Sequence, residues 1–308
     1  MRSITVHSPA TVSNLCCGFD ILGLAIDEPY DIMQLTETEQ PGIVIRHTDA
    51  YNLPVSPTEN IAGVALQSMI DAVGYTGGFE VVIEKQIKPG SGIGSSAASA
   101  AGIVVAANAL LGDRFTKKEL VNFAMDGEVI ASGARHADNL APCIYGGLVL
   151  IRDTPTLDII SLETPPLYIS IVHPQIEIKT SYARKILPTD IPLKSAVVQW
   201  ANVAGLVTGF LQQDYALIGR SLQDIIIEPV RSKLIPGFDE VKRKCLEAGA
   251  LGGGISGSGP SLFMLSEKKE TAEQVALIMK NEFDKRGIEN KTYVTTINDS
   301  GVKIVNGS

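Results

Sequence analysis

The chain has 308 residues, of which 45% are hydrophobic and 19% charged, and 26 Lys and Arg against 34 Asp and Glu give a net charge of −8. This length suggests two domains or one large one, able to bury roughly three quarters of the unfolded surface without a disulfide or metal. The acidic balance argues against a non-specific nucleic-acid binder, which normally carries a basic face. Local donors must therefore hold any anionic ligand.

The four cysteines predict neither a zinc site nor a disulfide framework. Cys16 and Cys17 are adjacent, and Cys143 and Cys245 lie far from them, so the usual zinc spacings are missing. We interpret them as reduced thiols of a cytoplasmic protein. The N-terminus lacks the apolar run of a signal peptide. The apolar stretch Ser95–Leu111 is slightly short for a membrane span and rich in alanine, which favours a buried helix, so we expect no membrane or nucleic-acid partner.

The first half of the chain begins with predicted strands and continues into helices. Asn60 is placed to cap a helix whose apolar residues follow the 3.6-residue period. A Gly/Ser turn after Gly90 leads into the alanine-rich helix, and an amphipathic helix is predicted over Lys117–Ser132. Short apolar blocks bounded by Pro, Asn and Gly predict strands at Ile4–Val6, Ile21–Ile26, Ile32–Leu35, Gly42–Arg46, Gly78–Glu84 and Gly146–Ile151.

A proline-rich stretch, Asp153–Pro166, is the best candidate for a domain boundary, which divides the chain into residues 1–160 and 161–308. Strands and helices follow it without a regular βαβ alternation, so the predicted class is α+β. The predicted elements are a strand over Leu167–Val172, helices over Lys194–Gln213, Asp214–Ile226 and Pro236–Ala248, and a strand–helix–strand unit over Ala250–Ile297.

A glycine-rich loop precedes the alanine-rich helix. Its glycines at every second position let backbone N–H groups turn towards a ligand, and the helix start adds unpaired donors, which together suit a phosphate chain. A flexible turn capped by serine explains the spacing alone equally well, and neither a Walker A nor a Rossmann pattern fits. The candidate cofactor-binding residues are Pro89, Gly90, Ser91, Gly92, Ile93, Gly94, Ser95, Ser96, Ala97, Ala98 and Ser99.

This loop resembles the ATP-binding loop of the small-molecule kinases that include galactokinase, homoserine kinase, mevalonate kinase and phosphomevalonate kinase. Pro9–Gly23 resembles an N-terminal block of the homoserine kinases, and Gly252–Ser261 is similar to the third glycine motif of the family. The resemblance spans nearly the whole chain, although Cys16-Cys17 replaces the usual Gly-Pro or Gly-x pair. It implies an N-terminal ribosomal-S5-like domain and a ferredoxin-like C-terminal domain, with the active site between them.

The same resemblance implies an amino-acid substrate. Asn14 and Asp20 alone suggest an Asx turn, and Arg184 and Arg231 alone suggest surface residues. In the homoserine kinases the matching residues contact the amino acid, so Asp20 is expected to bind the ammonium and the two arginines the carboxylate, as forked guanidinium groups do. The substrate-binding residues implied in this way are Asn14, Asp20, His136, Arg184, Arg231 and Gly257.

The resemblance also implies ATP and Mg²⁺. Glu128 alone would be a solvated helix residue, but with Ser96 it becomes the expected Mg²⁺ ligand pair, in keeping with the oxygen ligands that this ion prefers. Asp138 and Asn139 are the candidate catalytic residues. Whether Asp138 acts as a base stays open, because a loose phosphoryl-transfer transition state needs positioning and charge stabilisation more than early proton removal.

The activity implied is ATP-dependent phosphorylation of the side-chain hydroxyl of L-homoserine to O-phospho-L-homoserine, in threonine biosynthesis, by a homodimer. The first alternative is a kinase of another small alcohol. The second is a nucleotide- or RNA-binding module, because a fold alone does not fix a function. The net charge of −8 weighs against RNA.

Overall fold

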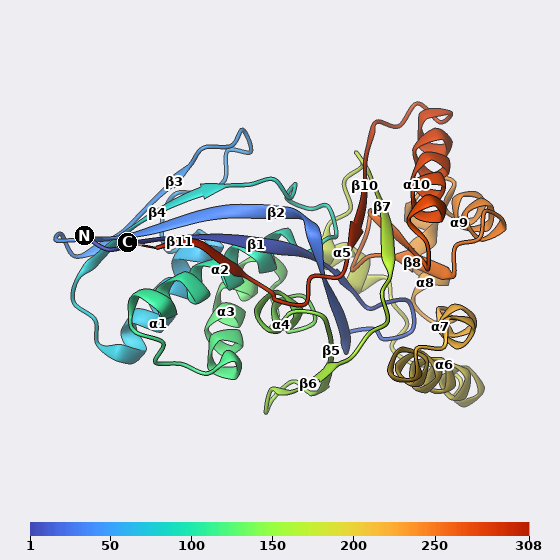
Figure 1. Cartoon of the computed structure of the whole chain (residues 1–308), viewed down its shortest axis with the longest axis horizontal. Helices are drawn as coiled ribbons and strands as arrows, with labels where there is room; N and C mark the ends of the chain where they lie inside the picture. The colour runs from blue at the N-terminus through green and yellow to red at the C-terminus, as the bar shows by residue number, and fades with distance from the viewer. Residues whose placement is uncertain (308) are drawn as a thin grey trace.

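The computed structural model describes residues 1–307, except for the side chain of Ser132. Two mixed layers of sheet and helix follow each other along the long axis of the molecule, and the two chain ends lie close together at the far end of the first layer (Figure 1). The α+β class predicted from the sequence is confirmed.

The first sheet has seven strands and is built around the long strand β2. Strand β2 pairs with β1 through much of its length, and β4, β3 and β5 extend the sheet beyond it. All pairs are antiparallel except β3 with β4. The strands are β1 (Ser3–Ser13), β2 (Leu22–Thr38), β3 (Gly42–His47), β4 (Gly78–Glu84), β5 (Leu148–Asp153), β6 (Asp158–Leu162) and β11 (Lys303–Gly307).

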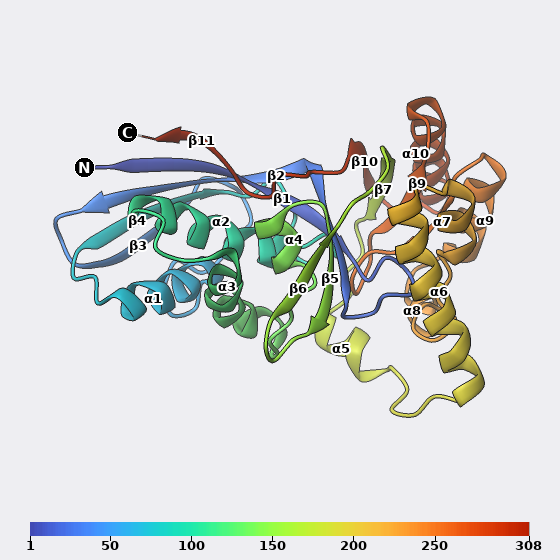
Figure 2. The same ribbon diagram turned by 60° about the horizontal axis from the view of Figure 1, so that its bottom comes forward.

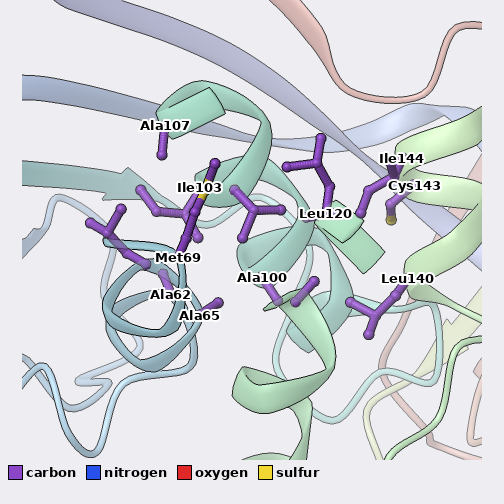
Figure 3. Close-up of a cluster of buried hydrophobic side chains, with 14 of the residues drawn as sticks. Ala62, Ala65, Met69, Ala100, Ile103, Ala107, Leu120, Leu140, Cys143 and Ile144 are labelled. Atoms are coloured by element: carbon purple, nitrogen blue, oxygen red, sulfur yellow. The ribbon is translucent and has the colours of Figure 1, made fainter. Parts of the chain in front are cut away.

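Four helices cover one face of this sheet (Figure 2). They are α1 (Ile61–Val73), α2 (Ser95–Leu110), α3 (Lys117–Ser132) and α4 (Leu140–Tyr145). Helix α1 begins as predicted, with the Asn60 side chain accepting hydrogen bonds from two N–H groups of the first turn at 2.9 and 3.3 Å. Helix α2 is buried on nearly every side because it packs against α1, α3, α4 and the sheet, and Figure 3 shows its small residues between its neighbours. Its alanines therefore allow close packing.

The second sheet has four antiparallel strands in the order β10-β7-β9-β8. Since these are the fourth, first, third and second strands of this half, the order is that of the ferredoxin-like split βαβ fold, as expected. Its strands are β7 (Tyr168–Pro174), β8 (Gly252–Ile255), β9 (Leu262–Ser266) and β10 (Asn290–Thr296). Its helices are α5 (Thr180–Lys185), α6 (Leu193–Gln212), α7 (Tyr215–Ser221), α8 (Glu228–Arg231), η1 (Ser232–Leu234), α9 (Phe238–Glu247) and α10 (Lys269–Asp284).

Several predicted elements differ from the structure in their extent. The separate strands predicted at Ile21–Ile26 and Ile32–Leu35 are one continuous strand, β2. The helix predicted over Asp214–Ile226 ends at Ser221 as α7. It stops because the Asp224 carboxylate accepts hydrogen bonds from the next backbone N–H groups at 2.9 Å, an alternative to continuing the helix that aspartate often provides.

A shared core joins the two halves. Leu22 and Leu24 of β2 lie in the same buried cluster as Ile169 of β7 and Phe263 of β9. The last strand, β11, returns to pair with β1 in the first sheet. The division at residues 160 and 161 stays a prediction. It falls within β6, and both β6 and the last strand, β11, belong to the first sheet.

Candidate active site

The glycine-rich loop leaves the start of α2 open to a ligand. Gly90, Gly92 and Gly94 have φ angles of 74°, 84° and 72°, in the left-handed region that glycine adopts readily. Gly94 is the N-cap residue and has no side chain that could cap the helix, and the Ser95 hydroxyl donates away from the helix start, to the Ile87 carbonyl at 2.8 Å. The first N–H groups of α2 therefore lack a side-chain cap and can bind an anion.

The third glycine motif holds this loop from the opposite side. The Ser256 hydroxyl donates to the Gly92 carbonyl at 2.8 Å, and the N–H of Ser261 donates to the Ser91 carbonyl at 3.2 Å. Gly257 joins the motif to β1 through its N–H, which donates to the Ser13 carbonyl at 3.3 Å. Segments from both halves of the chain thus fix one loop.

A buried lysine supports the first turn of α2. Lys85 forms an ion pair with Asp31 and donates to the Ser95 carbonyl at 2.7 Å and the Ser99 hydroxyl at 2.9 Å. Burial raises the pKa of the Asp31 carboxyl, while the Lys85 ammonium opposes that shift. Sequence reasoning missed Lys85, because a single lysine at the end of a strand carries no motif of its own.

Glu128 lies beside the loop, near the end of α3. It forms a side-chain hydrogen bond with Ser96, and burial raises its pKa to about 7, with the charge of Asp138 adding to the shift. The two expected Mg²⁺ ligands are therefore neighbours. Among the residues described, no three His, Cys, Asp or Glu side chains gather as a metal cluster.

The turn after β1 carries the first two predicted substrate residues. Asn14, Leu15 and Cys16 have φ angles of 71°, 43° and 64°, so three successive non-glycine residues take the left-handed conformation. The Asn14 amide donates to the Gly257 carbonyl at 3.0 Å and accepts from the Asp20 N–H at 3.0 Å. The Cys16-Cys17 departure is thus accommodated, with both thiols buried in the shared core.

Arg184 and Arg231 both reach this turn. Arg184 donates two hydrogen bonds to the Asp20 carboxylate, at 2.8 and 3.0 Å. Arg231 is 3% exposed and donates to the Ala183 carbonyl at 3.2 Å and the Gly257 carbonyl at 2.9 Å. Asp20, the residue expected to bind the substrate ammonium, therefore forms an ion pair with Arg184, one of the two residues expected to bind the substrate carboxylate.

Asp138 and Asn139 precede α4. Burial raises the pKa of the Asp138 carboxyl, the charge of Asp20 raises it further, and a hydrogen bond with Ser13 opposes the shift. The Asn139 amide oxygen accepts from Thr11 at 2.8 Å, and its nitrogen donates to the Ser13 hydroxyl at 3.0 Å. Asn139 is therefore held rigidly by β1.

One cleft of about 300 Å³ collects most of these groups from both halves of the chain. The predicted residues that line it are Asn14, Asp20, Pro89, Gly90, Ser91, Gly92, Gly94, Ser95, Ser96, Ser99, Glu128, His136, Asp138, Asn139, Arg184, Arg231 and Gly257. Three predicted loop residues are instead buried in the apolar clusters, namely Ile93, Ala97 and Ala98, so they offer the cleft no side chain.

The cleft also contains residues that sequence reasoning did not select. Phe19, Thr180 and Ser258 lie inside or beside motifs that were recognised in the sequence, so they could have been selected as site residues from their positions. Leu53 lies in a stretch without a recognised motif, and Ile61 is part of the apolar pattern of α1, so nothing in their sequence context marks either as a site residue.

The comparisons with known proteins agree with this geometry. Residues 60–147 match the family model described as the GHMP kinases N terminal domain, and residues 206–285 match the one described as GHMP kinases C terminal. The chain belongs to the GHMP kinase family. The first model covers α1 to α4 with the glycine-rich loop, and the second extends from α6 to α10.

Three relatives at 40% identity or more are homoserine kinases that match nearly the whole chain. A homoserine kinase from Chloroherpeton thalassium is 44% identical, covering 99% of this chain and all of the relative, and one from Methanocella arvoryzae is 40% identical, covering 99% and 98%. The crystal structure of homoserine kinase from Cytophaga hutchinsonii is 47% identical, with a TM-score of 0.95 and coverage of 98% and 97%.

A more distant member shows the same fold. The crystal structure of L. major mevalonate kinase in complex with R-mevalonate has a TM-score of 0.74 at 17% identity, covering 94% of each chain. Across residues 1–307 of this chain, no helix is long and apolar enough to cross a membrane.

Proposed function

We propose that the chain is a homoserine kinase, which transfers the γ-phosphoryl group of ATP to the side-chain hydroxyl of L-homoserine in threonine biosynthesis. The observation that carries this proposal is that one cleft holds an uncapped helix start beside a carboxylate and two arginines. The first feature suits a triphosphate and the second suits an amino acid. The full-length homoserine kinases at 40–47% identity support the same activity.

ATP would bind with its phosphates at the glycine-rich loop. Residues of the loop from Gly90 to Ser96 line the cleft together with the start of α2, whose partial positive charge favours phosphate. Ser96 and Glu128 would hold Mg²⁺, and when bound this ion neutralises phosphate charge. The lysine Lys85 keeps the first turn of α2 in place.

The amino acid would bind at the turn after β1. A zwitterion complements the ion pair of Asp20 with Arg184, because its ammonium meets a carboxylate and its carboxylate meets a guanidinium. Arg231 adds a second guanidinium, and its hydrogen bonds go only to neutral carbonyl oxygens. Asn14 fixes the backbone of Asp20, and we propose that His136 completes the binding site.

Catalysis would rest on positioning and on charge stabilisation. The homoserine oxygen forms a bond to the γ-phosphorus while the bond between that phosphorus and the leaving ADP oxygen breaks. The hydroxyl proton must leave as well, and Asp138 is a carboxylate of the cleft whose raised pKa suits proton acceptance. Asn139 lies next to it, held by Thr11 and Ser13.

The test is ATP consumption with homoserine, mevalonate, shikimate and galactose as acceptors, with the phosphorylated product identified by mass spectrometry. The proposal expects turnover with L-homoserine and at least a hundredfold lower kcat/KM for the other alcohols, because they lack the ammonium and carboxylate pair. No turnover of homoserine, or preference for another acceptor, would refute it.

We also propose that the protein is cytoplasmic and forms a homodimer. All four cysteines are free and buried, as in a reducing compartment. The support for a dimer is an apolar stripe along α6, whose exposed residues follow one another at spacings of four, three, four and seven. Such a stripe can pack against a second copy of itself in antiparallel orientation. Its members are Leu193, Val197, Trp200, Ala204 and Leu211.

A further inference from the structure

We infer that Phe19 is a positioning residue that sets the carboxylate specificity of the cleft, by holding the guanidinium groups of Arg184 and Arg231 where a substrate carboxylate meets both. This inference rests on the proposed function. Phe19 lines the cleft beside these arginines.

The geometry places one aromatic ring against two cations. The Cζ atom of Arg184 lies 5.3 Å from the centre of the Phe19 ring, and that of Arg231 lies 5.2 Å from it. Both distances are within the roughly 6 Å at which the negative face of a ring attracts a cation. Phe19 is therefore the common neighbour of the two groups expected to bind the substrate carboxylate.

The charges around Arg231 explain why a ring is useful there. Arg231 is almost fully buried, and its hydrogen bonds to Ala183 and Gly257 reach only neutral oxygens. Burial lowers its pKa, and the nearby charge of Arg184 lowers it further. A carboxylate in place of Phe19 would pair with Arg231 and compete with the substrate. An aromatic ring stabilises the cation without neutralising it, so the guanidinium keeps its affinity for an anion.

Hydrogen bonds fix the backbone on both sides of Phe19. Asn14 accepts hydrogen bonds from the residues on both sides of Phe19, through its carbonyl from the Gly18 N–H at 2.8 Å and through its side chain from the Asp20 N–H at 3.0 Å. Asp20, directly after the ring, has a φ of 62°. The ring therefore projects from the same turn that presents Asp20, which couples the ammonium and carboxylate sites geometrically.

The experiment compares homoserine with 3-aminopropanol, which is homoserine without its carboxylate. In Phe19→Leu the ratio of kcat/KM for homoserine to kcat/KM for 3-aminopropanol should fall about tenfold, because only homoserine uses the arginines. The KM for ATP should change less than twofold. Phe19→Tyr, which keeps the ring, should recover most of the ratio. An unchanged ratio in Phe19→Leu, or an equal loss for both acceptors, would overturn the inference.

A second variant covers the case in which Phe19→Leu does not fold. A ring-fluorinated phenylalanine at position 19 keeps the shape of the side chain and removes the negative face of the ring. The inference expects a fall in the same ratio, and an unchanged ratio would overturn it. If the unmodified enzyme turns over homoserine but the ratio does not respond, only the inference fails. If the unmodified enzyme does not phosphorylate homoserine, the proposed function fails and the inference with it.

Discussion

Glu128 lines the cleft and has a raised pKa. Its burial there should lower the stability of the folded protein at pH values above that pKa. Its folded-state pKa of about 7 exceeds the ordinary value of 4.5, so the folded protein retains a proton that the unfolded chain releases within that interval. Stability from this group is therefore lost as the pH rises from about 4.5 to 7. The direction is opposite to that of a carboxylate in a salt bridge.

We expect Glu128→Gln to melt higher than the parent protein at pH 8 without Mg²⁺, by about 2–4 °C, since it removes a charge that burial disfavours. At pH 4 the two melting temperatures should agree. The same variant should lose at least tenfold in kcat with Mg²⁺ and ATP. Differential scanning calorimetry and initial rates measure both effects, and equal melting temperatures at pH 8 would contradict the assigned environment.

Site residues that belong to recognisable motifs could be predicted from the sequence. Contacts that arise only when distant segments pack together could not. Asp20 and Arg231 could be selected because their flanking residues resemble those of known kinases. That Asp20 pairs with Arg184 could not be predicted, because 164 positions separate them and only the fold joins them. Lys85 was missed for a related reason, since its importance comes from the Asp31 carboxylate opposite it.

The proposed cofactor site depends on the junction between the glycine-rich loop and α2. Gly94 has a φ of 72°, and a Cβ atom there would lie 2.1 Å from the Thr11 hydroxyl oxygen and 3.2 Å from Asn139 Oδ1. The backbone of this junction is therefore in close contact with β1. An added Cβ therefore requires the Thr11 side chain, the loop or the strand to move.

Gly94→Ala should lower the free energy of unfolding by at least about 2 kcal/mol and raise the KM for ATP tenfold or more. Gly74→Ala is the matched control, because Gly74 has a φ of 61° at the end of α1 with no atom within 4 Å of an added Cβ. That control should lose only about 1 kcal/mol and keep its KM for ATP. An unaltered KM in Gly94→Ala would argue against phosphate binding at this loop.

Elements with a strong local signal were predicted closely. Helix α3 has the bounds predicted for it, because the Thr116 cap and the amphipathic pattern agree. Helix α5 and strand β11 were missed. Strand β11 forms only by pairing with β1, from the other end of the chain. Its sequence is short and exposed, and it gives no signal of that contact.

For the whole molecule, the apolar stripe of α6 predicts association. Trp200 is 60% exposed at the centre of that stripe. We expect Trp200→Glu to convert a dimer into a monomer in sedimentation velocity experiments. Leu277→Glu is the matched control, because Leu277 is 57% exposed on α10 and should leave the dimer intact. A monomeric parent protein would contradict the proposal.

Neither half of the chain contains the complete site. The phosphate loop and Glu128 come from the first half, whereas Arg184 and Arg231 come from the second. The shared core that contains Leu22 and Phe263 keeps them together. The α+β class and the ferredoxin-like strand order of the second half could be predicted. The shared core between the two halves could not, because it depends on contacts between distant strands.

The most direct test of the account is a crystal structure of the protein with L-homoserine, Mg²⁺ and a non-hydrolysable ATP analogue. We expect the substrate carboxylate on Arg184 and Arg231, its ammonium on Asp20, and the phosphates on the N–H groups between Gly90 and Ser96. Its hydroxyl should face the γ-phosphate. Homoserine bound elsewhere, or phosphates away from the start of α2, would contradict the account.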